Sequence, residues 1–182
     1  MTEEKRSLRL PAPQKGVVAF GFGVPWSIRS NLDIALIAMQ KAVELKARVY
    51  TQRDVRIDAG YQAADGFRVD YYDEEDPKNP PTTLGMARAA ARWAAERNMR
   101  ELWIVAAKPH LWRCVRDLRA AITEIDEDIG VRVCKEIEQF PEDHSWFCPD
   151  STQVRTQNRL RWYRREVILK VMPFFIYKRV AG

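Results

Sequence analysis

A histidine and an arginine one helical turn apart are the residues of this sequence best placed to do chemistry. His110 and Arg113 follow an apolar run at residues 102–107, which predicts a buried strand that passes through a loop into a helix. A separation of three residues places the imidazole and the guanidinium on one side of that helix. A guanidinium can donate two hydrogen bonds to a phosphate or carboxylate, and an imidazole can give or take a proton near neutral pH. The pair therefore predicts an anion site, although a capping role for His110 and a solvent-exposed Arg113 remain the alternative.

Two further short motifs could complete such a site. Gly21 and Gly23 stand at the turn after a predicted strand, where glycine lets the backbone approach a ligand and leaves amides for an anion. Thr82 and Thr83 follow two prolines and open a predicted helix, whose first turn also presents hydroxyls and free amides. A tight turn explains the glycines equally well, and a simple helix cap explains the threonines equally well.

Alternating strands and helices position these residues. Period-two and unbroken apolar runs predict strands at residues 16–20, 47–51, 67–71, 102–107 and 131–134. Helical spacing predicts helices at residues 32–45, 84–97, 111–123 and 158–171, and the final stretch at 173–177 is interpreted as a short strand or a packed tail. This alternation predicts an α/β fold, a three-layer Rossmann-like domain with a mainly parallel sheet and helices on both faces. In such folds ligands bind at the carboxyl ends of the strands, where His110 is expected.

Length and composition fit a single globular domain. The chain has 182 residues, of which 46% are hydrophobic and 30% charged. We expect a flexible N-terminal arm over residues 1–15 and one α/β domain over residues 16–182. No apolar run approaches the roughly 18 residues that span a bilayer, and the first residues lack the apolar segment of a signal peptide. We therefore expect a cytoplasmic protein with no membrane partner.

The charged residues are unevenly distributed around a net charge of +5. Acidic residues gather at 70–76, a loop that could form the wall or lid of a site. Asp73 and Glu74 could hold a divalent metal or accept from a sugar hydroxyl, although a solvated loop is the preferred interpretation. Arginines gather at 155–165, interleaved with Trp162 and Tyr163, and could bind nucleic-acid phosphates with aromatic stacking beside them. A helix with one apolar and one arginine face has the same pattern and is preferred, so we do not expect nucleic acid as a partner.

The spacing of histidines and cysteines suggests a zinc site, but the usual cysteine motif is missing. His110 and Cys114 are four residues apart, as are His144 and Cys148, with Cys134 between the pairs. The sequence contains no Cys-x-x-Cys, so we interpret the cysteines as reduced thiols and expect no metal site. A nucleophile elbow and a phosphate loop ending in lysine and serine or threonine are also absent. No motif identifies a cofactor or an oligomeric state.

Four short motifs occur in a distinctive order: the glycine turn at 17–23, the threonine-led helix at 81–87, His-x-x-Arg at 110–113, and an arginine-glutamate helix at 162–166. In this order the chain resembles the YdcF and SanA family of bacterial proteins, which is of largely unknown function. The resemblance implies a Rossmann-like fold over most of the chain. The family follows its second strand with a Ser-Gly turn and a glutamate-led helix, whereas residues 50–54 of this chain lead into an irregular stretch.

These inferences combine into one functional expectation. We expect a domain that binds a small anionic ligand, phosphorylated or nucleotide-like, and that acts on it if it is an enzyme. Arg113 would neutralise the anion and His110 would act as acid, base or hydrogen-bond donor. The alternatives are a non-catalytic ligand-binding or regulatory module, and an arginine-rich interaction surface for nucleic acid or protein. The predicted ligand contacts beside His110 and Arg113 are Gly21, Gly23, Thr82 and Thr83.

Overall fold

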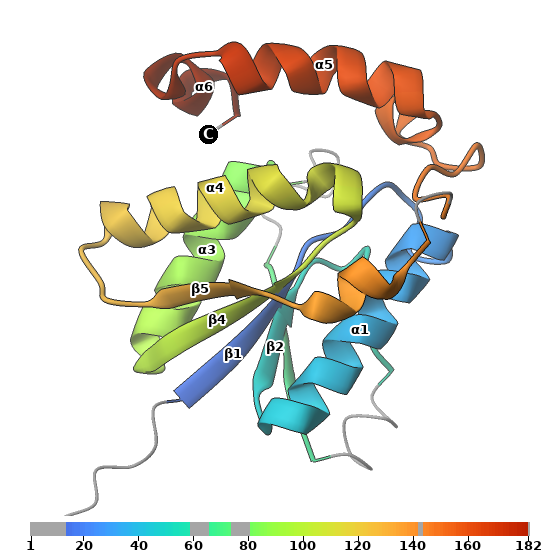
Figure 1. Ribbon diagram of the computed structural model, residues 1–182. Coiled ribbons are helices and arrows are strands. Elements are labelled where there is room, and N and C mark those ends of the chain that lie inside the picture. The colour runs from blue at the N-terminus through green and yellow to red at the C-terminus, as the bar shows by residue number, and fades with distance from the viewer. Residues whose placement is uncertain (1–13, 59–65, 74–80, 142–143, 182) are drawn as a thin grey trace, which may run out of the picture.

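Parallel strands form the centre of the structure, a computed structural model that describes residues 14–58, 66–73, 81–141 and 144–181 (Figure 1). In these residues the sheet has five strands in the order β3-β2-β1-β4-β5, and every neighbouring pair is parallel. The chain moves outward from β1 to β3 and then crosses back to β4, so its direction of winding reverses between β1 and β4. The strands are β1 (Gln14–Ala19), β2 (Arg48–Thr51), β3 (Val69–Tyr71), β4 (Met99–Val105) and β5 (Gly130–Val133).

Helices cover both faces of this sheet. Figure 1 shows α1 on one face, and α3 and α4 side by side on the other, which makes a three-layer α/β fold of the predicted Rossmann-like type. The helices are α1 (Arg29–Leu45), α3 (Thr83–Glu96), α4 (Lys108–Glu124), α5 (Arg159–Val171) and α6 (Phe174–Ala181), with short 3-10 turns η1 (Lys135–Gln139) and η2 (Val154–Thr156).

The central strand β1 shows why the sequence forms a sheet buried on both faces. Successive side chains of a strand point to opposite faces, so Val17 and Ala19 pack in the core on the α1 side. Val18 and the following Phe20 pack in the core beneath α3 and α4. All four are buried, and a strand that is covered on both sides accordingly has an unbroken apolar sequence.

The C-terminal segment folds back over α4. The Trp162 indole N–H on α5 donates to the Pro109 carbonyl oxygen at 3.2 Å, and Arg116 Nη1 on α4 donates to the Leu169 carbonyl oxygen at 3.3 Å. These contacts place α5 beyond α4, on the outside of the molecule (Figure 1). In the described part of the chain no helix is both long and apolar enough to cross a membrane.

Of the two expectations for residues 173–177, the short strand is wrong, because Phe174–Ala181 forms α6, and the packed tail is confirmed, because Tyr177 is buried against Leu84 and Leu169. The aromatic residues of this stretch favour a strand by local preference, but tertiary packing decides the outcome. Phe174 and Tyr177 lie one helical turn apart with stacked rings, and the Tyr177 hydroxyl donates to the fully buried Asp117 carboxylate of α4. Pro173 precedes the first turn, where a missing N–H removes no helical hydrogen bond.

Two residues of the predicted N-terminal arm belong to the sheet instead. Gln14 and Lys15 are part of β1, where they pair with the start of β4. The remaining arm residues, 1–13, lie outside the described residues.

Candidate functional site

Segments that are distant in the sequence meet around one pocket at the carboxyl edge of the sheet. The loops after β1 and β2 meet the starts of α3 and α4 there, beside the point where the winding reverses, and the segment 153–162 closes the other side. The cavity has a volume of about 30 Å³, which is room for roughly two waters or one compact polar group. Its lining is Phe20, Gly21, Phe22, Gly23, Gln52, Asp54, Pro81, Thr83, His110, Arg113, Gln153, Arg155, Thr156 and Trp162.

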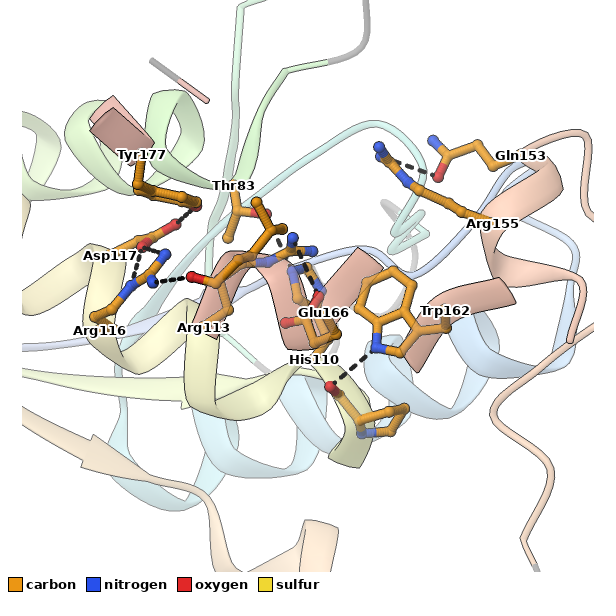
Figure 2. Close-up of polar contacts among 12 residues, drawn as sticks. Thr83, His110, Arg113, Arg116, Asp117, Gln153, Arg155, Trp162, Glu166 and Tyr177 are labelled. Atoms are coloured by element: carbon orange, nitrogen blue, oxygen red, sulfur yellow. Dashed lines mark hydrogen bonds and ion pairs between the residues drawn. The ribbon is translucent and has the colours of Figure 1, made fainter. Parts of the chain in front are cut away.

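His110 lies in the first turn of α4 with its ring in this pocket. The side chain is 6% exposed, and its Nε2 lies 3.0 Å from Thr83 Oγ1 (Figure 2). Burial lowers the pKa of His110 well below its usual value, the positive charges of Arg113 and Arg155 lower it further, and the Gly21 backbone opposes the shift. The imidazole is therefore neutral near pH 7, and in that form Nε2 can accept a hydrogen bond from the Thr83 hydroxyl.

Arg113 lies on the same side of α4 as His110, as the three-residue spacing predicts, and it is buried with a partner. Its Nη1 is 3.3 Å from Oε2 of Glu166 on α5, which is 2% exposed. The guanidinium also lies 5.1 Å from the centre of the Trp162 ring, within range of a cation–π interaction. Burial raises the pKa of Glu166, and the Arg113 charge lowers it. Glu166 thus supplies the counter-charge for Arg113.

Arg155 reaches the pocket from η2 without such a counter-charge. It donates one long hydrogen bond, 3.4 Å, to Gln153 Oε1 (Figure 2). No ion pair within 4.0 Å joins it to any acidic residue that the structure describes, and its buried Nε has no hydrogen-bond partner there. Burial, followed by the charges of Arg165 and Arg113, lowers the pKa of Arg155 to about 10, and the Glu166 charge opposes this shift, so the group is still cationic at neutral pH. The lining therefore holds two guanidinium groups and one carboxylate, that of Asp54.

Gly21 and Gly23 line the pocket, but two backbone amides of their turn already donate hydrogen bonds to side chains of the protein. The Gly21 amide donates to Gln52 Oε1 and the Phe22 amide donates to Asn31 Oδ1, both at 2.8 Å. These two amides are therefore occupied and do not offer the free donors that the sequence suggested. Gly23 has φ +97°, and a Cβ there would lie 2.8 Å from side-chain oxygens of the segment 151–156. This packing requirement accounts for glycine at position 23.

The two predicted threonines have different roles. The Thr82 hydroxyl accepts from the Gly85 amide at 3.0 Å, which caps α3, and Thr82 does not line the pocket. Thr83 does line the pocket, and its hydroxyl contacts His110. The helix-cap interpretation thus holds for Thr82, and only Thr83 lies with the other predicted site residues.

The acidic loop contributes no side chain to this pocket in the described part of the chain. Asp70 is held by Arg48 at 3.5 Å and Arg97 at 3.6 Å, and it accepts from the Trp93 indole N–H at 2.8 Å. Asp73 lies 3.9 Å from Arg53 at the surface. Glu74 and the following residues to position 80 lie outside the described residues.

The zinc hypothesis has no support from the described residues, where no three His, Cys, Asp or Glu side chains converge. Cys114 is fully buried, and burial raises the pKa of its thiol well above the usual value. Burial also raises the pKa of Cys134 to about 12. Both behave as buried, protonated thiols.

Five of the fourteen lining residues were predicted from the sequence as site residues, and the other nine were not. Gln52 and Asp54 directly follow β2, so the rule that sites form at strand ends could have identified them. Gln153 and Thr156 follow no strand and belong to no motif, because the folding back of the C-terminal segment brings them to the pocket. Arg155 was grouped with the later arginines, from which the structure separates it.

Comparison with known proteins adds no identity to this geometry. No family model matches the chain, and no curated protein matches it. The resemblance to the YdcF and SanA family therefore stays a prediction.

Proposed function

We propose that this domain binds a small phosphorylated ligand with the phosphoryl group in the pocket between Arg113 and Arg155. The observation that carries the proposal is Arg155, a largely buried cation that forms no ion pair within 4.0 Å with any carboxylate that the structure describes. A buried charge without a counter-ion is unfavourable, and a bound anion supplies that counter-ion.

The chemistry of the lining favours phosphate among anions. Guanidinium groups match the geometry of phosphate oxygens and can donate two parallel hydrogen bonds to them. Arg113 is held in place by Glu166 and Trp162, so one side of the clamp is already ordered before a ligand binds. The small cavity fits a phosphoryl group, and the remainder of a sugar phosphate or nucleotide would extend outward from it.

Catalysis is a second candidate function, favoured by the 3.0 Å contact between Thr83 Oγ1 and His110 Nε2. Because burial and the two arginines keep His110 neutral, its Nε2 can accept a proton from a hydroxyl group beside the phosphoryl group. The hydroxyl would be that of a water: its oxygen attacks the phosphorus, the phosphorus–oxygen bond of the ester breaks, and the protonated His110 returns the proton to the leaving oxygen while the guanidinium groups stabilise charge on the phosphoryl oxygens.

Calorimetric titration with inorganic phosphate tests the binding proposal. We expect Arg155→Gln to weaken phosphate binding at least about tenfold, because it removes charge-assisted hydrogen bonds. Arg161→Gln is the matched control, since Arg161 is an exposed arginine on α5 whose side chain contacts Gln157. Equal affinities in the three proteins, or no phosphate binding by the wild type, would contradict the proposal.

The same proteins separate an enzyme from a binding module. If the site is catalytic, the wild type and Arg161→Gln should release phosphate from phosphate monoesters, and His110→Asn should not. Binding without release in all of them would leave ligand binding as the function.

A further inference from the structure

The outward side of α5 combines aliphatic and cationic residues in an arrangement that the pocket does not explain. The inward side consists of Trp162, Glu166 and Leu169, which are spaced four and three residues apart and buried. Helical geometry places the opposite residues in one stripe that faces away from α4. Four aliphatic side chains lie in that stripe: Leu160 (63% exposed), Val167 (57%), Ile168 (58%) and Val171 (77%). We call this stripe the outer face of α5. Clustered exposure of this kind marks an interaction surface.

Cations surround the outer face. Arg164 lies within the stripe, four residues after Leu160 and seven before Val171. Exposed cations flank the stripe on both sides, namely Arg159, Arg161, Arg165 and Lys170. The single acidic residue of α5, Glu166, is buried against Arg113. The exposed surface of this helix therefore carries five cations and no acid.

We propose that the outer face of α5 binds an anionic lipid surface, with the helix lying in the plane of the membrane interface. Aliphatic side chains gain free energy by entering the boundary between headgroups and acyl chains, while neighbouring arginines and lysines contact anionic headgroups. The long cationic side chains can bury their methylene stems and keep their charged ends at the headgroups. Charge complementarity and the aliphatic stripe thus indicate the same partner.

Other partners fit this face less well. Nucleic acid would use the cations, but the aliphatic stripe gains nothing at a phosphate backbone. Of the two aromatic rings among the arginines, Trp162 is buried and only Tyr163, 38% exposed, could stack on a base. A second copy of the chain paired through the same face would bring five cations of each α5 together without an exposed acid on either helix.

This proposal differs from the expectation of no membrane partner, which rested on the lack of a spanning segment. The described residues indeed contain no helix able to cross a membrane. A helix that lies on the surface does not need that length, and its binding depends on one apolar face with flanking cations. α5 has both features in 13 residues.

Co-flotation of the full chain with lipid vesicles tests the proposal. We expect the protein to float with vesicles of phosphatidylcholine and phosphatidylglycerol, to bind pure phosphatidylcholine much more weakly, and to dissociate as salt increases. Arg164→Gln should weaken binding about fivefold, the effect of one interfacial cation. Val171→Ser should weaken it by a similar factor, because less apolar surface enters the interface.

Matched variants keep this test specific. Arg119→Gln replaces an exposed arginine of α4, and Leu36→Ser replaces a side chain on α1 that is 48% exposed. Both should bind vesicles like the wild type, as should Arg155→Gln, because the pocket takes no part. All replaced α5 side chains are exposed, so unchanged melting temperatures should accompany the loss of binding.

Three results would overturn the proposal. The first is failure to bind anionic vesicles at low salt. The second is binding to duplex DNA that depends on Arg164 and not on Val171, which would identify a nucleic-acid surface. The third is a dimer in sedimentation that Val171→Ser dissociates, which would make the outer face a contact between two copies.

Discussion

Arg155 and Arg161 are close in sequence but lie in opposite environments. Arg155 is on the wall of the pocket, where burial and neighbouring arginines lower its pKa to about 10. Arg161 is exposed on α5 and donates a 2.8 Å hydrogen bond to Gln157. Water screens the second charge more fully than the first, so a bound anion compensates the first charge more than the second. Two cations of one sequence cluster can thus serve different partners.

The two arginines of the pocket differ in how their charges are compensated. Arg113 has Glu166 as a buried partner at 3.3 Å, whereas Arg155 has no carboxylate partner among the described residues. The first arrangement orders the site, and the second leaves it able to attract an anion. Substitutions that alter one of these environments and leave the other intact test this distinction.

Removing the carboxylate of Glu166 should have the largest effect. Glu166→Gln leaves Arg113 as a second buried cation without a counter-charge, and we expect the free energy of unfolding to fall by about 3 kcal/mol. Arg164→Gln on the exposed side of α5 should change it by less than about 0.5 kcal/mol. Urea unfolding near pH 7 measures both, and added phosphate should restore part of the loss in Glu166→Gln. Equal stability of the two variants would show that burial does not distinguish these charges.

The buried His110 should make stability depend on pH. Its pKa is lowered in the folded protein, whereas an unfolded histidine titrates near about 6.5. Between these two values the unfolded chain binds one more proton, so the free energy of unfolding falls as pH decreases, by up to about 1.4 kcal/mol per pH unit. Above about pH 6.5 both states are neutral and this contribution to the slope disappears.

His110→Asn isolates the histidine contribution from those of other groups. The variant should lose this slope while keeping the pH dependence that arises from carboxyl groups. Urea unfolding of both proteins between about pH 7 and about pH 5 makes the comparison. Parallel profiles would mean that His110 titrates alike in the folded and unfolded chains.

The sequence predicts the framework of the fold well because that framework follows from local patterns. The apolar run at 102–107 overlaps β4, and the apolar stripe at 32–45 lies within α1. The rule for strand ends then places His110 at the pocket, and helical spacing brings Arg113 beside it. Local patterns do not predict the contacts between segments that are distant in the sequence. Neither the occupation of the Gly21 amide by Gln52 nor the burial of Arg155 follows from residues nearby in the sequence.

The C-terminal arginine segment shows that local patterns also fail to predict which side chains the fold buries. Trp162 between arginines suggested a stacking surface, yet its ring is buried against Phe22, with ring centres 4.6 Å apart. The preferred interpretation of a helix with an apolar and an arginine face was closer, but α5 exposes aliphatic residues among its arginines. Burial of a single side chain, which depends on tertiary packing, decides between these interpretations.

Imidazole ¹⁵N NMR during a phosphate titration tests the pocket most directly, because the chain has two histidines and they report on different places. His110 lies in the pocket, whereas His144 lies 3.1 Å from Asp33 of α1. We predict that phosphate shifts the His110 signals and raises the pKa of His110, since a nearby anion favours the imidazolium form, while the His144 signals stay in place. In Arg155→Gln the His110 response should require a much higher phosphate concentration. An unmoved His110, or equal movement of both histidines, would contradict an anion site between Arg113 and Arg155.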